Sequence, residues 1–188
     1  MMDNGFSLQL KQSFHGDEYF TPKYAVDVIV PHLNKFKKIW CPFDKEDSQF
    51  VKVLKERGFD VTYGHIETGQ DFFSYDSVPN GCECVVSNPP FSKRQQIIER
   101  LYQFDIPFAL IMNFNGLFDS KKRWEMFKDN GVEILVPLGR MAFVSKEKGK
   151  LNSPNFQSVY VCHNILDKQI EYAHMDKMDG GVNDAADN

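Results

Sequence analysis

Apolar residues along this chain gather into short continuous runs, separated by stretches in which they recur at helical spacing. Several of the runs are rich in β-branched or aromatic residues and are bounded by glycine, proline or asparagine, which is typical of buried strands. The strands predicted in this way cover residues 37–44, 59–63, 82–86, 108–112, 132–136 and 156–162.

Amphipathic helices are predicted between these runs. Within residues 93–104, Ile97, Ile98 and Leu101 repeat at the spacing of one buried helix face. Two further helices are predicted at residues 46–57 and 121–130, with Gly58 and Gly131 as their stops.

Another helix is predicted to begin beside Thr21. This residue is a good N-cap, and Pro22 would occupy the first helical position, where its fixed φ angle is already suitable. The apolar positions continue to Leu33, although Pro31 is expected to kink or end the helix early.

The alternation of strands and helices predicts an α/β domain. Its central sheet is expected to be mostly parallel, with an antiparallel last strand pair and helices on both faces. Residues 1–16 are interpreted as an N-terminal extension, residues 17–166 as one domain, and residues 167–188 as a polar, partly disordered tail.

Composition narrows the class of protein. The chain has 188 residues, and 42% of them are hydrophobic, which is enough for the core of one domain. No apolar run approaches the length of a membrane span. The four cysteines follow neither a disulfide framework nor a zinc-site spacing, so we expect reduced thiols in a cytoplasmic protein and no metal. The net charge of −4 opposes simple binding to nucleic acid, so phosphate contacts would need local basic patches.

The segment Ser87-Asn88-Pro89-Pro90-Phe91 follows the predicted strand at 82–86. Two consecutive prolines fix two φ angles and remove two N–H donors, so neither helix nor strand can continue through them. The segment is therefore predicted to form a stiff ledge that carries one amide, one aromatic ring and backbone carbonyls.

Asn88 to Phe91 resembles the catalytic motif of S-adenosylmethionine-dependent N6-adenine DNA methyltransferases, in particular small members of phage type. The resemblance implies a Rossmann-like class I methyltransferase fold. It also implies that Asn88, Pro89, Pro90 and Phe91 are catalytic. The Asn88 side-chain oxygen and the Pro89 carbonyl would accept hydrogen bonds from an exocyclic amino group, which orients its lone pair for methylation without a strong base. Phe91 would stack on a base extruded from its helix.

The same resemblance implies a binding site for S-adenosylmethionine. Tyr19 to Pro22 resembles the segment that holds the methionine end of this cofactor, and the loop after the first strand departs from the family because it contains no glycine. The acidic residue usual after the second strand is also missing, and Asp44, Asp47 or His65 are its candidate replacements. The implied cofactor-binding residues are Tyr19, Phe20, Thr21, Pro22, Cys41, Pro42, Phe43, Asp44, His65, Asp71, Phe72, Ser87 and Asn88.

A long segment at 137–155 lies between the last two predicted strands and combines lysines with aromatic residues. Long loops of this kind are either functional or solvated and disordered. We interpret it as a nucleic-acid loop, with basic side chains on phosphates and a phenyl ring on the extruded base. The predicted substrate-binding residues are Lys93, Arg140, Phe143, Lys146 and Phe156.

Three functions remain open from the sequence. The first is N6-adenine methylation of DNA, which we prefer over RNA because the cofactor-holding segment is N-terminal and no RNA-binding appendage is visible. The second is the same chemistry on RNA adenine or protein glutamine. The third is a nucleic-acid-binding module on a catalytically decayed fold, which the glycine-free loop favours. The recognition sequence and the oligomeric state are not predicted.

Overall fold

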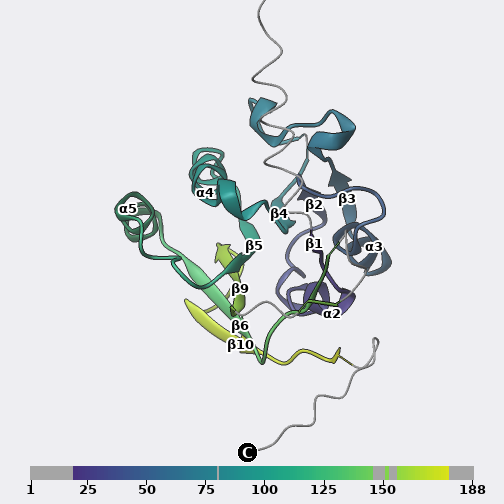
Figure 1. Ribbon diagram of the computed structural model, residues 1–188. Helices are drawn as coiled ribbons and strands as arrows, with labels where there is room; N and C mark the ends of the chain where they lie inside the picture. The colour runs from purple at the N-terminus through teal and green to yellow at the C-terminus, as the bar shows by residue number, and fades with distance from the viewer. Residues whose placement is uncertain (1–18, 80, 146–150, 153–155, 178–188) are drawn as a thin grey trace, which may run out of the picture.

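Seven strands form one twisted sheet in the order β10-β6-β9-β5-β4-β2-β3 (Figure 1). It is described from a computed structural model, for residues 19–79, 81–145, 151–152 and 156–177. In chain order the strands are β2 (Lys38–Cys41), β3 (Asp60–Tyr63), β4 (Cys84–Ser87), β5 (Phe108–Asn113), β6 (Glu133–Pro137), β9 (Ser158–His163) and β10 (Ile170–Ala173).

The sheet is parallel apart from one strand. β3, β2, β4 and β5 pair parallel to one another, and β10 pairs parallel to β6. β9 lies between β5 and β6 and is antiparallel to both. The predicted α/β fold, a mostly parallel sheet with an antiparallel strand pair near its end, is confirmed.

Helices cover both faces of the sheet, as predicted. α2 (Lys23–Asp27) and α3 (Gln49–Glu56) pack on one face, and α4 (Arg94–Gln103) and α5 (Lys121–Asn130) pack on the other (Figure 1). The central strands therefore bury both sets of side chains. In β5, for example, Ala109 and Ile111 join the core beneath α2 and α3, whereas Phe108, Leu110 and Met112 join the core beneath α4 and α5.

Side-chain caps set the starts of two helices. Ser48 and Ser120 accept hydrogen bonds from the backbone N–H groups of Val51 and Arg123, at the starts of α3 and α5. The predicted stops are confirmed: Gly58 and Gly131 follow these helices with φ angles of 89° and 81°, which side-chain-bearing residues rarely adopt.

The start of α2 differs from the prediction. Pro22, and not Thr21, occupies the N-cap position, with extended backbone angles. The helix ends at Asp27, and a 3₁₀ turn, η1 (Val30–His32), contains Pro31. A helix of five residues has only a weak dipole, so its first turn attracts an anionic group only weakly.

A second, small sheet joins two distant parts of the chain. β1 (Tyr19–Phe20) pairs antiparallel with β7 (Phe143–Ser145), which pairs in turn with β8 (Leu151–Asn152). The Tyr24 hydroxyl also accepts a hydrogen bond from the Ala142 backbone N–H at 2.8 Å. The predicted cofactor-holding segment therefore lies beside part of the predicted substrate loop.

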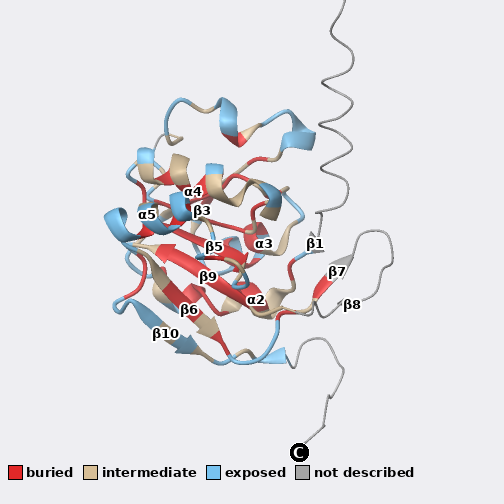
Figure 2. Cartoon of the chain, turned by 60° about the vertical axis from the view of Figure 1, so that its left-hand side comes forward, coloured by how far each residue is buried: buried red, intermediate tan, exposed pale blue. Residues whose placement is uncertain are grey.

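The sheet also extends beyond the predicted end of the domain. β10 lies in the segment that we expected to be a polar tail, and its backbone pairs with β6 from Ile170↔Ile134 to Ala173↔Pro137. It is an edge strand with alternating exposure, and Tyr172 is 82% exposed, so Figure 2 draws β10 largely in the exposed colour. Within the described residues, no helix is both long and apolar enough to cross a membrane.

Candidate active site

The carboxyl ends of β2 and β4 lie side by side near the middle of the sheet. The two strands pair at Ile39↔Cys84 and Trp40↔Val85. From β2 the chain continues to β3 on one side, whereas from β4 it continues to β5 on the other. Such a switch point in an open α/β sheet is the usual place for a ligand.

A buried carboxylate joins these two strand ends. The Ser87 hydroxyl donates a hydrogen bond to the Asp44 carboxylate, and both residues are buried. Burial raises the pKa of the Asp44 carboxyl to about 7, although the hydrogen bonds from Ser87 and Ser48 act in the opposite direction. The hydrogen bond to Asp44 therefore fixes the position of Ser87, the residue immediately before Asn88.

Asn88 offers an acceptor without a protein donor. Its Nδ2 donates a hydrogen bond to Thr21 Oγ1 at 3.1 Å, which fixes the orientation of the amide. Its Oδ1 is buried and has no hydrogen-bond partner among the residues that the structure describes. Leaving a buried acceptor unpaired costs about 1–3 kcal/mol, so this oxygen suits a ligand that brings an N–H group.

The two prolines form the predicted ledge. Pro89 is buried, and Pro90 has φ −61° and ψ 122° before the 3₁₀ turn η4 (Phe91–Lys93). Phe91 packs edge-to-face against Phe156, with the ring centroids 6.2 Å apart and an interplanar angle of 81°. The structure therefore brings together two aromatic residues that the sequence assigned to the substrate.

Of the predicted cofactor contacts after β3, Asp71 and His65 both bind nearby backbone. Asp71 Oδ1 accepts a hydrogen bond from the Phe73 N–H at 2.9 Å and so caps the 3₁₀ turn η3 (Phe72–Ser74). His65 Nδ1 accepts one from the Glu67 N–H at 3.1 Å and caps the turn η2 (Ile66–Thr68). Each has a local structural role in addition to any role with a ligand.

The predicted aromatic contact Phe72 is mainly a core residue. It is 2% exposed, with ring centroids 5.6 Å from Trp40 and 4.9 Å from Phe43. Phe43, which is half-buried, and Phe73, which is 38% exposed, present part of this cluster to solvent. A flat ligand would therefore meet the cluster at those two rings.

The loop after β2 contributes mostly backbone. Cys41 and Pro42 are buried, and the Cys41 carbonyl accepts a hydrogen bond from the Gly64 N–H at 3.1 Å. Burial raises the pKa of the Cys41 thiol well above its ordinary value. Upstream, Phe20 is 49% exposed, and the Tyr19 backbone pairs with Ser145.

The predicted substrate residues are separated by the fold. Arg140 is exposed and Lys93 is half-buried in η4. Phe143 is 3% exposed and belongs to the core beneath α2 and α3, so in this conformation its ring cannot stack on an extruded base, contrary to our expectation. Lys146 lies outside the described residues.

The loop after β5 carries two exposed phenyl rings that sequence reasoning did not select. Arg94 and Arg123, from α4 and α5, both donate hydrogen bonds to the Gly116 carbonyl, at 3.2 and 2.6 Å. Phe114 and Phe118 flank this point and are 44% and 42% exposed. The available signal was the Asn113-Phe-Asn-Gly-Leu-Phe118 segment after a buried strand.

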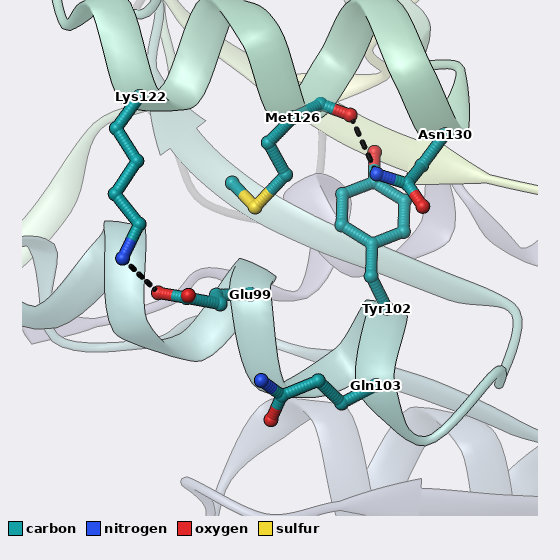
Figure 3. Close-up of a pocket in the computed structure, with 6 residues that line it drawn as sticks. All are labelled: Glu99, Tyr102, Gln103, Lys122, Met126 and Asn130. Carbon is teal, nitrogen blue, oxygen red and sulfur yellow. Dashed lines mark hydrogen bonds and ion pairs between the residues drawn. The ribbon is translucent and has the colours of Figure 1, made fainter.

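A second depression lies away from the strand ends. It is an open groove of about 340 Å³ between α4 and α5, in which Lys122 pairs with Glu99 (Figure 3). The Asn130 side chain donates back to the Met126 carbonyl of its own helix. None of the predicted site residues lines this groove, so we place the candidate site at the ends of β2 and β4.

Comparison with known proteins connects part of the chain to a methyltransferase. No protein-family profile matches the sequence. The type II methyltransferase M.EcoRI of Escherichia coli is 29% identical over 98 residues, which are 48% of this chain. These residues span 30% of the length of that relative. The crystal structure of precorrin-6y C5,15-methyltransferase from Geobacter metallireducens aligns with a TM-score of 0.47 and 14% identity, covering 78% of this chain and 93% of that one.

Proposed function

We propose that the protein transfers a methyl group from S-adenosylmethionine to the exocyclic N6 amino group of adenine in DNA. The observation that carries this proposal is the buried, unpartnered Asn88 Oδ1 on the proline ledge at the switch point of the sheet. The partial similarity to a type II methyltransferase supports the reaction class.

The proposed catalysis depends on positioning. Asn88 Oδ1 and the Pro89 carbonyl accept the two N–H groups of the target amine, so that its nitrogen becomes pyramidal and its lone pair points in one direction. S-adenosylmethionine, when bound, would supply an electrophilic methyl group and leave as S-adenosylhomocysteine. No strong base is required, because the proton of the methylated amine would be lost to water after the transfer. Phe91, supported by Phe156, would provide the aromatic contact to the target base.

The residues present fit the adenine end of the cofactor better than its ribose. Asp71 and the exposed parts of Phe43 and Phe73 would hold the adenine. Asp44 does not replace the missing ribose carboxylate, because its carboxylate is buried and binds Ser87. Asp47 is exposed beside it and is the better candidate.

A non-catalytic nucleic-acid-binding module is the second candidate function. The observation in its favour is the glycine-free loop after β2 together with the inward-facing Asp44. It differs from the first proposal in one measurable property, because a decayed module has no affinity for the cofactor.

Three measurements test the proposal. Isothermal titration with S-adenosylmethionine and S-adenosylhomocysteine should show saturable binding, and tritiated methyl transfer should label DNA more than RNA or protein. Nucleoside analysis of labelled DNA should yield N6-methyladenine. Labelling of RNA adenine or protein glutamine instead would identify a different substrate for the same chemistry. Absence of cofactor binding would favour the non-catalytic module over the methyltransferase.

Replacing Asp71 with asparagine should weaken cofactor binding without a loss of stability. Asp71→Asn can keep the hydrogen bond to the Phe73 N–H, but its remaining amide group is a donor and cannot accept from an adenine amino group. We expect the dissociation constant for S-adenosylhomocysteine to rise about tenfold or more. Asp76→Asn, at an exposed position beyond η3, is the matched control. Equal affinities for Asp71→Asn and the control would leave Asp71 with its capping role alone.

Thr21 should control the orientation of Asn88. Because Thr21 Oγ1 accepts from Asn88 Nδ2, Thr21→Val removes this acceptor at nearly constant volume and allows the amide to rotate. The loss of one neutral hydrogen bond is expected to lower kcat about fivefold. Thr21→Ser keeps the hydroxyl and should retain the wild-type rate. Similar rates for the valine and serine variants would argue against this positioning role.

A further inference from the structure

The loop after β5 lies at the same edge of the sheet as the Asn88 ledge, but it begins further along the strand direction. Ser87, the last residue of β4, pairs with Leu110, whereas β5 continues to Asn113. Three additional residues of strand correspond to about 10 Å. The loop at residues 114–119 therefore begins beyond the end of β4, beside the ledge from which the reaction is proposed to occur.

Two arginines hold this loop in one conformation. Arg123 Nε donates to the Leu117 carbonyl at 2.5 Å, and Arg94 donates to the Asn115 and Gly116 carbonyls at 3.5 and 3.2 Å. The Asn113 side chain accepts from the Asn115 N–H at 2.8 Å. The loop is therefore ordered by the protein itself before any ligand arrives.

This ordered loop exposes two phenyl rings, which we call the β5-loop platform (Phe114 and Phe118). Their centroids are 6.4 Å apart at an interplanar angle of 76°, and each ring is more than 40% exposed. Leu117 between them is fully buried and anchors the loop. Phe118 also rests on Phe127, at 5.7 Å. Fixed, exposed aromatic rings beside a catalytic ledge are suited to binding another flat group.

The charges beside the platform favour a polyanion. Arg94 directly follows η4, and its guanidinium shares the Gly116 carbonyl with that of Arg123. The pKa of Arg123 is lowered, mainly because its guanidinium is partly buried and secondly because of the charge of Arg94. Asp119 is the acidic group that faces the two arginines. With Lys93 beside them, the positive charges at the platform outnumber this negative charge.

We propose that the β5-loop platform stacks on a base of the substrate strand that neighbours the target adenine, while Arg94 and Lys93 lie near its phosphates. This inference rests on the proposed function, because it assumes a nucleic-acid substrate on the ledge. Stacking on phenyl rings tolerates any base, so the platform adds affinity and not sequence selectivity. It also gives an acidic chain a local surface for nucleic acid.

The test measures binding of a random-sequence DNA of 20 nucleotides, single-stranded and duplex, to the full chain saturated with S-adenosylhomocysteine. Phe114→Leu keeps an apolar side chain without a ring, and Phe114→Trp keeps a ring. Tyr172→Leu on β10 is the control for loss of an exposed aromatic elsewhere. Fluorescence anisotropy gives the dissociation constants, and methyl transfer gives kcat and KM.

We expect Phe114→Leu to weaken DNA binding about tenfold or more, with KM raised and kcat retained. Phe114→Trp and Tyr172→Leu should bind like the wild type, and Phe118→Leu should repeat the effect at the second ring. Wild-type affinity in both leucine variants of the platform would overturn the inference and leave the proposed function standing. DNA binding with the predicted pattern but without methyl transfer would support the platform and refute the activity. A wild-type chain that binds no DNA would overturn both.

Discussion

Asn88→Ala is expected to reduce methyl transfer about a hundredfold or more while leaving S-adenosylmethionine binding within a few fold of wild type. The variant removes Asn88 Oδ1, a buried acceptor that no described residue pairs. Loss of one preorganised dipole of this kind typically costs roughly two to three orders of magnitude in rate. Single-turnover methyl transfer at saturating cofactor measures the effect on the chemical step directly.

Two controls separate catalysis from folding in this experiment. Asn34→Ala removes an exposed amide that is distant from Asn88 in the sequence, and this variant should retain full activity. Thermal unfolding of Asn88→Ala should remain close to wild type, because the substitution removes only the hydrogen bond to Thr21 and an unpaired group. A folded Asn88→Ala protein that retains activity within a few fold would refute the catalytic assignment.

Asp44→Asn should make the protein more stable at pH 8 and change its stability little at pH 4. The pKa of the Asp44 carboxyl is raised to about 7 in the folded protein, against about 3.9 in an unfolded chain. The folded state therefore binds this proton more tightly, so the free energy of unfolding falls as pH rises from about 4 to about 7. The difference of about three pKa units sets an upper limit of about 4 kcal/mol.

Urea unfolding at pH 4 and pH 8 measures this effect. Asp44→Asn keeps an acceptor for the Ser87 hydroxyl but has no charge to bury, so its stability should depend less on pH than that of the wild type. Asp47→Asn, three residues away and exposed, removes a carboxylate without relieving burial and should follow the wild-type pH dependence. Parallel curves for Asp44→Asn and wild type would show that Asp44 is not the group responsible.

The central strands could be predicted because burial on both faces requires continuous apolar residues. The run at 108–112 became β5 for this reason. β10 escaped prediction because its four residues alternate between exposed and half-buried positions at the edge of the sheet. Phe143 was assigned to the substrate because a phenyl ring in a lysine-rich loop resembles a stacking residue, and only the folded structure shows that it is buried in the core beneath α2 and α3.

The arrangement within the site depended on contacts that no local pattern contains. Asn88 and Thr21 are 67 positions apart, and Asp44 and Ser87 are 43 positions apart. The sequence identified all four residues, but it assigned Thr21 to capping a helix and holding the cofactor, and Asp44 to binding a ligand. Which polar atom is paired, and which is left for a ligand, follows from side-chain directions set by the whole sheet.

The position of β9 has a consequence for how the chain folds during synthesis. Among the described strands, β6 is connected to β5, β4, β2 and β3 only through β9, although β6 is made about twenty residues earlier. Until residues 158–163 have left the ribosome, β5 is an open edge and β6 has no place in the sheet. A nascent chain halted before this point exposes an apolar strand edge, which favours aggregation or capture by a chaperone. Insertion of β9 between its neighbours is therefore the step that joins β6 to the strands formed earlier.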